Sequence, residues 1–152
     1  PYIKEEISLK NIIEILIEPI QKAKLFEITL QVDAFENDVV DSDMQTNLYR
    51  IVQEQLTNIL KHAQASKVKI LVRLTKKLIK LHVTDNGKGF DMLTSKDGIG
   101  LENIKRRAEM FSGKCKLKSS PGNGCELMVE LPLKTVSLKS AEKMRLAASV
   151  SS

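Results

Sequence analysis

The chain has 152 residues and a formal net charge of +5, with 42% hydrophobic and 28% charged residues. These proportions suit a globular domain with one core. Because we find neither a signal peptide nor an apolar run of bilayer length, we expect a cytoplasmic protein. Residues 134–152 carry four basic residues against one acidic residue, so the surplus left for the rest is too small for a nucleic-acid-binding domain. The aromatic content of 4% also argues against single-strand recognition.

A helix and a strand are the first predicted elements. Ser8 can cap a helix that runs to about Lys22, in which Pro19 should introduce a kink or an early end. Alternating apolar residues then predict a strand over Phe26–Val32. An acidic loop follows over Ala34–Asp41.

A long amphipathic helix comes next, capped by Ser42 or Asp43. At about 100° per residue its apolar residues share one broad face, which must pack on a core. That face holds Leu48, Tyr49, Val52, Leu56, Ile59, Leu60 and Ala63. The polar face holds Asn47, Arg50, Glu54, Asn58, Lys61 and His62. Periodicity alone favours an ordinary solvated face for these polar residues.

One residue of the polar face needs a further explanation. Asn has poor helix propensity because its side chain competes for backbone hydrogen bonds, so Asn58 in mid-helix needs a tertiary role. Its neutral oxygen lies one turn from the Glu54 carboxylate and one turn from the Lys61 ammonium. This set suits Mg²⁺ bridged to phosphates. Glu54 would then polarise a metal-bound water or the attacking group, and Lys61 would meet phosphate charge.

Two strands and a glycine-containing turn follow the helix. Lys67–Leu74 and Leu78–Asp85 alternate apolar and polar residues, as half-buried strands do. Asp85 at a strand end can accept a hydrogen bond from an exocyclic amine, while Gly87 and Gly89 let the backbone approach a flat ligand. Taken alone, Asp-Asn-Gly is most often only a turn.

A second glycine cluster favours the ligand interpretation. Gly98 and Gly100 precede a helix predicted over Glu102–Phe111, and glycine at a helix start exposes N–H groups to phosphate. Residues 91–97 are bounded by glycines that can absorb backbone changes. We therefore expect this segment to be a mobile lid that nucleotide orders.

The elements together indicate one domain over residues 1–133. A strand from Lys114, a turn over 121–124 and a strand ending before Pro132 complete it. Hairpins and helices on one side only predict an α/β (α+β) fold, a two-layer sandwich of a mixed sheet with its helices on one face. Residues 134–152 are small, polar and basic, and we expect a C-terminal tail or linker there.

The two cysteines are predicted to be reduced. In a hairpin that turns at Gly122-Asn123, Cys125 faces Ser120 and Cys115 faces about Glu130. The thiols then lie apart, and the expected compartment is reducing.

The motifs, in this order, resemble the ATP-binding domain of sensor histidine kinases, in the GHKL ATPase superfamily. Residues 49–63 resemble the N box, 85–89 the G1 box, 98–107 the G2 box, and 122–132 the closing glycine-rich hairpin and strand. The resemblance covers about residues 8–133 and implies the Bergerat-type version of the same sandwich. The Lys-His ending of the N box and the short stretch before Gly98 are most like the short-lid nitrate-sensor and desaturase-sensor subfamily.

The resemblance implies ATP and Mg²⁺ as ligands. By position, Asn58 would chelate the metal, with Glu54 near it as base or water-orienting group, and Asp85 would bond the adenine amino group. The residues implied in nucleotide binding are Asn58, Lys61, His62, Asp85, Gly87, Gly89, Gly98, Gly100 and Leu101. The γ-phosphoryl group would pass to a histidine on a separate dimerisation domain and from there to a response regulator.

Two departures from the family pattern keep other functions open. Cys125 stands where the family usually has threonine, and His62 and His82 lie in the N box and in a strand, not on an exposed acceptor helix. An anti-sigma-factor-like serine kinase, or another ATPase of the superfamily, is the main alternative, although gyrase-like relatives have longer lids. A nucleotide-sensing or protein-interaction domain without chemistry is a third, against which Glu54, Asn58 and Asp85 argue.

Overall fold

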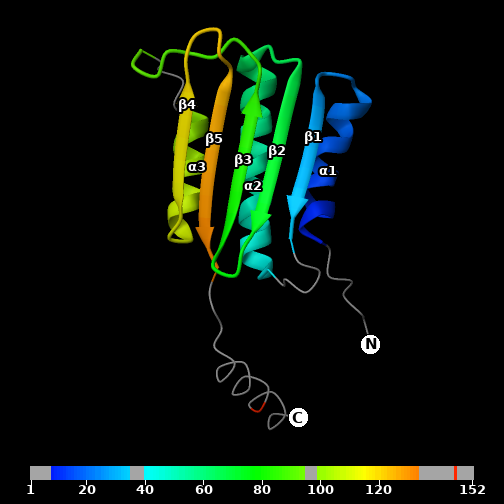
Figure 1. Ribbon diagram of the computed structural model, residues 1–152, viewed down its shortest axis with the longest axis vertical. Coiled ribbons are helices and arrows are strands. Elements are labelled where there is room, and N and C mark those ends of the chain that lie inside the picture. The colour runs from blue at the N-terminus through cyan, green and yellow to red at the C-terminus, as the bar shows by residue number, and fades with distance from the viewer. Residues whose placement is uncertain (1–7, 35–39, 95–98, 134–145, 147–152) are drawn as a thin grey trace.

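Within the residues that the structure describes, five strands form one mixed sheet. The computed structural model describes residues 8–34, 40–94, 99–133 and 146. The strands are β1 (Glu27–Asp33), β2 (Lys67–Leu74), β3 (Leu78–Asp85), β4 (Lys114–Ser119) and β5 (Cys125–Pro132). Their order is β1-β2-β3-β5-β4, in which β1 is parallel to β2 and the other neighbours are antiparallel (Figure 1).

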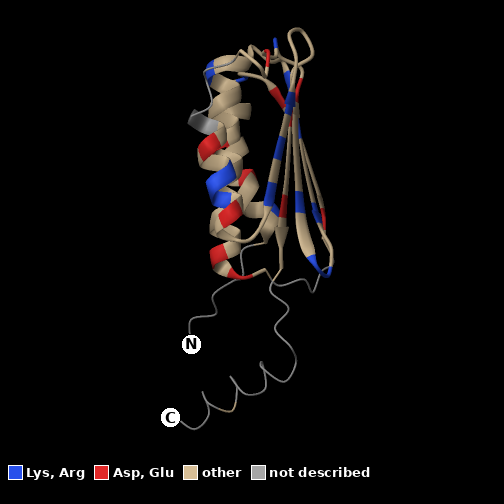
Figure 2. Cartoon of the chain, turned by 90° about the vertical axis from the view of Figure 1, so that its left-hand side faces the viewer, with Lys and Arg blue, Asp and Glu red and all other residues tan. Residues whose placement is uncertain are grey.

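The helices cover one face of this sheet. They are α1 (Leu9–Lys22), α2 (Ser42–Asn58), the π-helical turn η1 (Ile59–Ala63) and α3 (Ile99–Met110). Figure 2 shows them as one layer beside the sheet, which confirms the two-layer α+β sandwich expected from the sequence. None of the helices in the described ranges has both the length and the apolar character that crossing a bilayer requires.

Apolar side chains fill the space between the two layers. In β2 and β3 every second residue is buried, because successive side chains of a strand point to opposite faces. The least exposed core residues include Ile70, Val72, Ile79, Leu81 and Val83 from the sheet and Ile13, Leu48, Ile51, Val52 and Ile104 from the helices. Burial of apolar area contributes about 25 cal/mol per Å², so this layer is the main source of stability.

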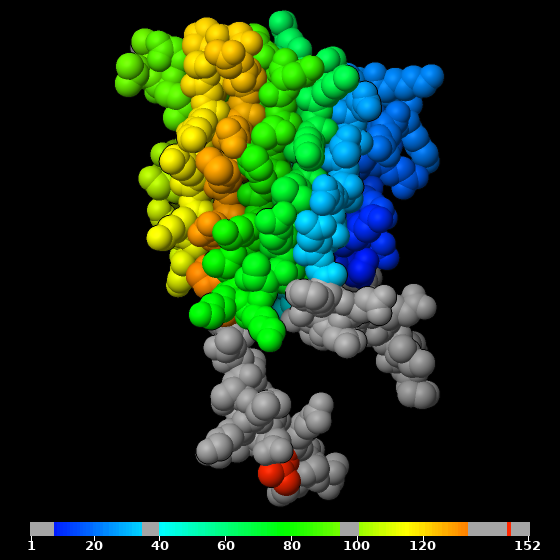
Figure 3. Space-filling view, viewed as in Figure 1, coloured from blue at the N-terminus to red at the C-terminus, as the bar shows by residue number. Residues whose placement is uncertain are grey.

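The opposite face of the sheet is polar. Figure 3 views it directly, with β4, β5, β3, β2 and β1 crossing it in turn. Its cross-strand pairs are Lys80 with Glu130 at 3.7 Å, Arg73 with Asp33 at 3.7 Å, and His82 with Glu126 at 2.7 Å. These side chains are all partly exposed, so each pair contributes little to stability and mainly keeps the face soluble.

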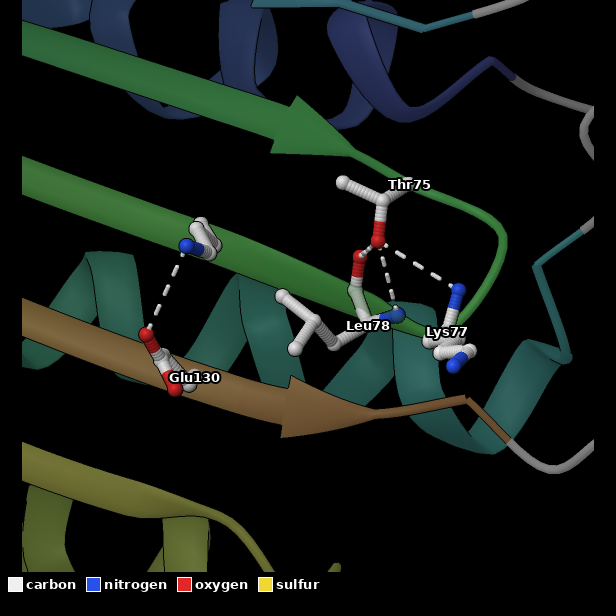
Figure 4. A network of polar contacts seen from close by, with 5 residues as sticks. Thr75, Lys77, Leu78 and Glu130 are labelled. Atoms are coloured by element: carbon white, nitrogen blue, oxygen red, sulfur yellow. Dashed lines mark hydrogen bonds and ion pairs between the residues drawn. The ribbon is translucent and has the colours of Figure 1, made fainter.

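The turn between β2 and β3 is closed by one hydroxyl. Thr75 Oγ1 accepts from the backbone N–H groups of Lys77 and Leu78 and donates to the Leu78 carbonyl oxygen (Figure 4). The Lys77 carbonyl oxygen in turn accepts from the N–H of Leu133 at 2.8 Å. The turn therefore fixes the β2–β3 register, which sets Asp85 opposite Val68 at the other end of the hairpin.

Most helix boundaries lie within a few residues of the predictions. Ser8 caps α1 as expected, because its Oγ accepts from the N–H of Asn11 at 3.2 Å. The early end at Pro19 was wrong, since α1 continues to Lys22. Pro19 removes one backbone hydrogen bond near the C-terminal end of α1, and the helix tolerates the loss of this one bond. α3 begins at Ile99 rather than at Glu102.

The N-cap of α2 differs from both predicted residues. Asp41 occupies the cap position and makes no side-chain cap bond, whereas Ser42 and Asp43 lie inside the first turn. The acidic loop expected before it falls mainly on residues 35–39, which lie outside the described residues.

Two assignments on the helix faces were wrong. Asn47, expected on the polar face, is 5% exposed. It lies against α3, where its amide finds a backbone partner. Leu60, expected inward, is 46% exposed. The helix changes from α to π after Asn58, and the wider turn rotates the residues that follow.

The hairpin register differs from the prediction by one residue. Cys125 pairs with Ser119 rather than Ser120, and Cys115 pairs with Val129 rather than Glu130. The connection has five residues between β4 and β5 and not a two-residue turn, which shifts the pairing. Both cysteines are free thiols, as expected.

Candidate functional site

A cavity of about 380 Å³ opens between the helix layer and one end of the sheet. We call it the site cavity. Its lining comes from α2, η1, the end of β3 and the loop after it, α3, β4 and β5. The lining residues are Gln55, Asn58, Ile59, His62, Ala63, Asp85, Lys88, Gly89, Phe90, Leu101, Leu117 and Cys125. The walls are mainly apolar and the polar groups are few, as in sites that bind flat organic ligands.

Asp85 places a carboxylate in the wall of the site cavity. It is the last residue of β3 and is 9% exposed. Its Oδ1 accepts from the N–H of Gly87 at 2.8 Å, whereas Oδ2 is buried and has no hydrogen-bond partner among the described residues. Burial raises the pKa of this carboxyl, and the nearby N–H groups of Gly87 and Cys125 partly offset the rise. A buried acceptor without a partner is costly, so Oδ2 is suited to a donor on a ligand.

The loop after β3 is fixed on the side of η1. Asn86 Oδ1 accepts from the N–H groups of Ser66 and Lys67, each at 2.9 Å, and Asn86 Nδ2 donates to Ser66 Oγ. The N–H of Lys88 donates to the Ala63 carbonyl oxygen at 2.8 Å. The loop is therefore held to the end of the N-box helix before any ligand binds.

The same loop is also fixed on the side of the hairpin. Ser119 Oγ accepts from the N–H of Phe90 at 3.0 Å and donates to the Gly124 carbonyl oxygen at 2.7 Å. The N–H of Gly122 donates to the Lys88 carbonyl oxygen at 2.7 Å. One hydroxyl at the end of β4 thus joins the loop after β3 to the connection between β4 and β5.

Two of the predicted glycines are required by close backbone contacts. A Cβ on Gly87 would lie 2.2 Å from the Ala63 carbonyl oxygen. A Cβ on Gly89 would lie 2.1 Å from the Ser120 carbonyl oxygen, and the residue has a φ of +61°. Both positions exclude a side chain, which explains the glycines without reference to a ligand.

The N-box residues divide between the cavity and its surroundings. Asn58 ends α2 and, with His62 of η1, lines the site cavity. Glu54 is half-buried and Lys61 is exposed, and neither belongs to the lining. The stripe that faces the cavity is therefore Gln55, Asn58, Ile59 and His62, one residue away from the predicted stripe at Glu54 and Lys61.

The glycine cluster before α3 is only partly described. Leu101 lines the site cavity, and Gly100 lies in the first turn of α3. Gly98 and the last three residues of the predicted lid, 95–97, lie outside the residues that the structure describes. At its other end α3 is joined to α2, because Asn47 Nδ2 donates to the Arg107 carbonyl oxygen at 2.9 Å.

Cys125 and Gln55 are two further polar groups in the lining of the cavity. Cys125 is half-buried, and burial together with the charge of Asp85 raises the pKa of its thiol to about 11. The side chain of Gln55 opposes that rise. Gln55 itself is 4% exposed. The thiol is therefore neutral at physiological pH and is an inert part of the wall.

Several cavity residues were not predicted from the sequence. They are Gln55, Ile59, Ala63, Lys88, Phe90 and Leu117, and Cys125 was noted only as a departure from the family. The spacing of Gln55, Asn58 and His62 at three and four residues was a usable signal, because it defines one face of a helix. For the apolar residues of the lining, the sequence pattern is the same whether the side chain faces a cavity or the core.

The described side chains alone do not form a metal site. No group of three or more His, Cys, Asp and Glu residues in the described ranges could hold an ion. Asn58 still places an amide at the cavity, and Mg²⁺ needs few protein ligands when phosphate oxygens supply the others. The donor set thus fits a metal that arrives with a phosphorylated ligand.

Comparison with known families and proteins gives consistent matches. Residues 43–135 match the family described as "Histidine kinase-, DNA gyrase B-, and HSP90-like ATPase". The chain is 33% identical over 136 residues to "Sensor histidine kinase ComP" and 31% identical over 134 residues to "Sensor histidine kinase LiaS", both of Bacillus subtilis (strain 168). Each alignment covers 88% of the chain, but only 18% of ComP and 36% of LiaS, so the chain spans a small part of these relatives.

Solved structures share the fold. The blue-light activated histidine kinase EL346 of Erythrobacter litoralis superposes with a TM-score of 0.64 at 16% identity, over 82% of this chain and 41% of that protein. Histidine kinase AdeS of Acinetobacter baumannii gives a TM-score of 0.65 at 14% identity, over 83% of this chain and 65% of that one. At these identities the likeness concerns the fold alone.

Proposed function

Because the chain belongs to the family of histidine kinase-, DNA gyrase B- and HSP90-like ATPases, we propose that it is the ATP-binding catalytic domain of a two-component sensor histidine kinase. The names of ComP and LiaS support the kinase assignment within that family. The observation that carries the proposal is the buried Asp85 Oδ2, an acceptor without a partner in the described structure, in the wall of a mainly apolar cavity.

Asp85 is suited to select adenine. The 6-amino group of adenine is a donor on the edge of a flat apolar ring, and it would satisfy Oδ2. Ile59, Ala63 and Leu117 offer apolar surface for the ring faces. Binding would therefore exchange an unpaired buried acceptor for a charge-assisted hydrogen bond.

The phosphates would extend from the base toward Asn58. In this proposal Asn58 is a Mg²⁺ ligand, Glu54 is the base or water-orienting group, and Lys61 and His62 contact the phosphates. Lys61 is exposed, so its flexible side chain can reach a ligand that lies outside the wall as described. Gly98, Gly100 and Leu101 complete the nucleotide site in the same proposal, and the start of α3 directs N–H groups toward anions.

The reaction is transfer of the γ-phosphoryl group from ATP to a histidine on a separate dimerisation domain, with ADP as the leaving group. From there the group would pass to a response regulator. Phosphoryl transfer depends mainly on positioning and on charge stabilisation, so this domain alone should bind ATP and turn it over slowly. His62 lies in the cavity wall and His82 in β3, so neither is proposed as the acceptor.

We also assign the subtype and compartment as proposals. The short stretch between Gly89 and Gly98 supports the short-lid nitrate-sensor and desaturase-sensor subfamily. The two free thiols support a cytoplasmic location. Residues 1–133 would form the domain, and 134–152 a tail or linker.

Calorimetry with Mg-ATP and Mg-ADP tests the proposal. We expect binding at micromolar to submillimolar nucleotide, a raised melting temperature, and a loss of ATP affinity when EDTA removes Mg²⁺. No binding at millimolar Mg-ATP would contradict the proposal. With a phosphoacceptor domain added, acid-labile label indicates phosphohistidine, whereas acid-stable label would indicate the serine-kinase alternative.

A further inference from the structure

We propose that Gln55 is a specificity-determining residue that reads a ring nitrogen of adenine beside the amino group bound by Asp85. This inference rests on the proposed ATP-binding function. It concerns a residue of α2 that contacts the cavity from the helix layer, opposite the sheet residues Asp85 and Cys125.

The position of Gln55 is unusual for its chemistry. It is 4% exposed, although a glutamine on a surface helix normally lies in water. It is one of three buried polar or charged residues in the described core, with Asn47 and Asp85. Asn47 is explained by its bond to Arg107. Gln55 lines the cavity instead.

Gln55 brings a primary amide to a cavity whose other buried polar group only accepts hydrogen bonds. The amide has an NH₂ group with two donor hydrogens, whereas the ionised Asp85 carboxylate has none. Cys125, which lines the same cavity, is a weak hydrogen-bond partner for an amide. An N–H of Gln55 can therefore donate to a ligand that enters the cavity.

The two polar groups form a pair that matches one base. Asp85 Oδ2 is an acceptor and the Gln55 amide is a donor, and both line the same cavity. Adenine presents a donor, its 6-amino group, between two acceptors, the ring nitrogens N1 and N7. Guanine presents an oxygen at position 6, which the carboxylate would repel. An acceptor and a donor together therefore select adenine more strongly than the carboxylate alone.

Deaza nucleotides test this assignment atom by atom. We would measure the affinities of ATP, 1-deaza-ATP, 7-deaza-ATP and GTP for the parent chain, for Gln55→Met and for Gln53→Met. Methionine keeps the length and helix propensity of glutamine but removes the donor. Gln53 is the matched control, because it lies on the same helix but does not line the cavity. Its side chain accepts a hydrogen bond from Arg50 instead.

The expected result is a coupling between one side chain and one ligand atom. The parent should bind ATP about 3–10-fold more tightly than one of the deaza analogues, as one hydrogen bond predicts. In Gln55→Met the affinities for ATP and for that deaza analogue should become equal, and the preference for ATP over GTP should decrease. Gln53→Met should change neither quantity. A merely structural role for Gln55 would weaken all four nucleotides alike.

The outcomes separate this inference from the proposal beneath it. If the parent binds ATP and Gln55→Met keeps both deaza ratios unchanged, the inference is overturned and the proposed function stands. If the parent binds no ATP, both are overturned. The melting temperature without ligand shows whether each variant is folded, and Gln55→Leu replaces Gln55→Met if the latter is not.

Discussion

Asn47 on α2 and Arg107 on α3 are joined by a hydrogen bond of 2.9 Å from the Asn47 amide to the Arg107 carbonyl oxygen. Arg107 lies in the last turn of α3, where carbonyl groups lack partners within the helix. The buried amide therefore caps a neighbouring helix rather than its own. Through this bond the helix that carries Asn58 holds the helix whose first turn borders the site cavity.

Replacing Asn47 by Ala should destabilise the fold. The change leaves a carbonyl oxygen without its partner and opens space in the core, which costs about 1–3 kcal/mol. Urea unfolding followed by circular dichroism measures the effect. Asn103→Ala is the matched control, because Asn103 is an exposed residue of α3, and it should shift stability by less than about 0.5 kcal/mol. Equal effects in the two variants would show that the bond is not a significant contact.

Replacing Asp85 by Asn should have opposite effects on stability and on binding. Burial raises the pKa of Asp85, so the ionised carboxylate opposes folding at neutral pH. Asn keeps an oxygen for the N–H of Gly87. We expect a higher melting temperature without nucleotide and about 10–100-fold weaker ATP binding, because a charge-assisted bond is lost.

The stability difference should depend on pH. A group with a raised pKa in the folded state favours folding when protonated, and this contribution is lost as pH rises through the folded pKa. The advantage of Asp85→Asn over the parent should therefore be present at neutral pH and shrink as pH falls. Melting curves at several pH values measure it. Asp33→Asn on the open sheet face is the control and should leave ATP affinity unchanged.

Replacing Gly87 by Ala should disturb the loop after β3. The new methyl group would lie 2.2 Å from the Ala63 carbonyl oxygen, so the loop must move away from η1. Such overpacking costs about 1–3 kcal/mol and would displace the N–H of Lys88 from the same oxygen. Gly122→Ala has open space around it and only a positive φ to accommodate, so its cost should be smaller. Denaturant titration ranks the two, and a reversed order would refute the packing argument.

The two cysteines should react slowly with iodoacetamide at neutral pH. The pKa of Cys125 is raised to about 11 and that of Cys115 is also raised, in both cases mainly by burial. Since the thiolate is the nucleophile, Cys125 should react at least about 10-fold more slowly than a free cysteine, and faster as pH rises. Mg-ATP should slow the reaction of Cys125 only, because Cys115 does not line the cavity. Mass spectrometry of the modified peptides measures both rates. Protection of Cys115 to the same extent would point to a general change in the fold.

The strands of the central hairpin could be predicted from the sequence to the residue. β2 and β3 have the predicted bounds. When apolar and polar residues alternate strictly, only one register puts all the apolar side chains on the buried face of the sheet. The order of the glycine motifs likewise indicated the loop that carries Asp85. These features depend on local patterns, and local patterns are visible in one sequence.

The face of α2 that meets the cavity could not be predicted in the same way. Periodicity assigns a polar residue to solvent, so Asn47 was placed on the wrong side and Gln55 was not considered. Their burial depends on partners in α3 and β5, which are distant in the sequence. The change from α to π helix after Asn58 also alters the phase of the residues that follow, and no residue type announces it.

The end of β3, which borders the site cavity, lies at one end of the sandwich, whereas the start of α1 and the end of β5 lie at the other (Figure 1). α1 begins at Leu9 at this second end. Leu133, which follows β5, lies there too, because its N–H donates to the carbonyl oxygen of Lys77 in the β2–β3 turn. Eight residues of β3 separate that end from Asp85, a path of about 25 Å. Under the proposed function, a phosphoacceptor domain joined at either of these ends would start about 25 Å from the carboxylate proposed to bind adenine, and it would have to fold back along the sandwich to reach the nucleotide.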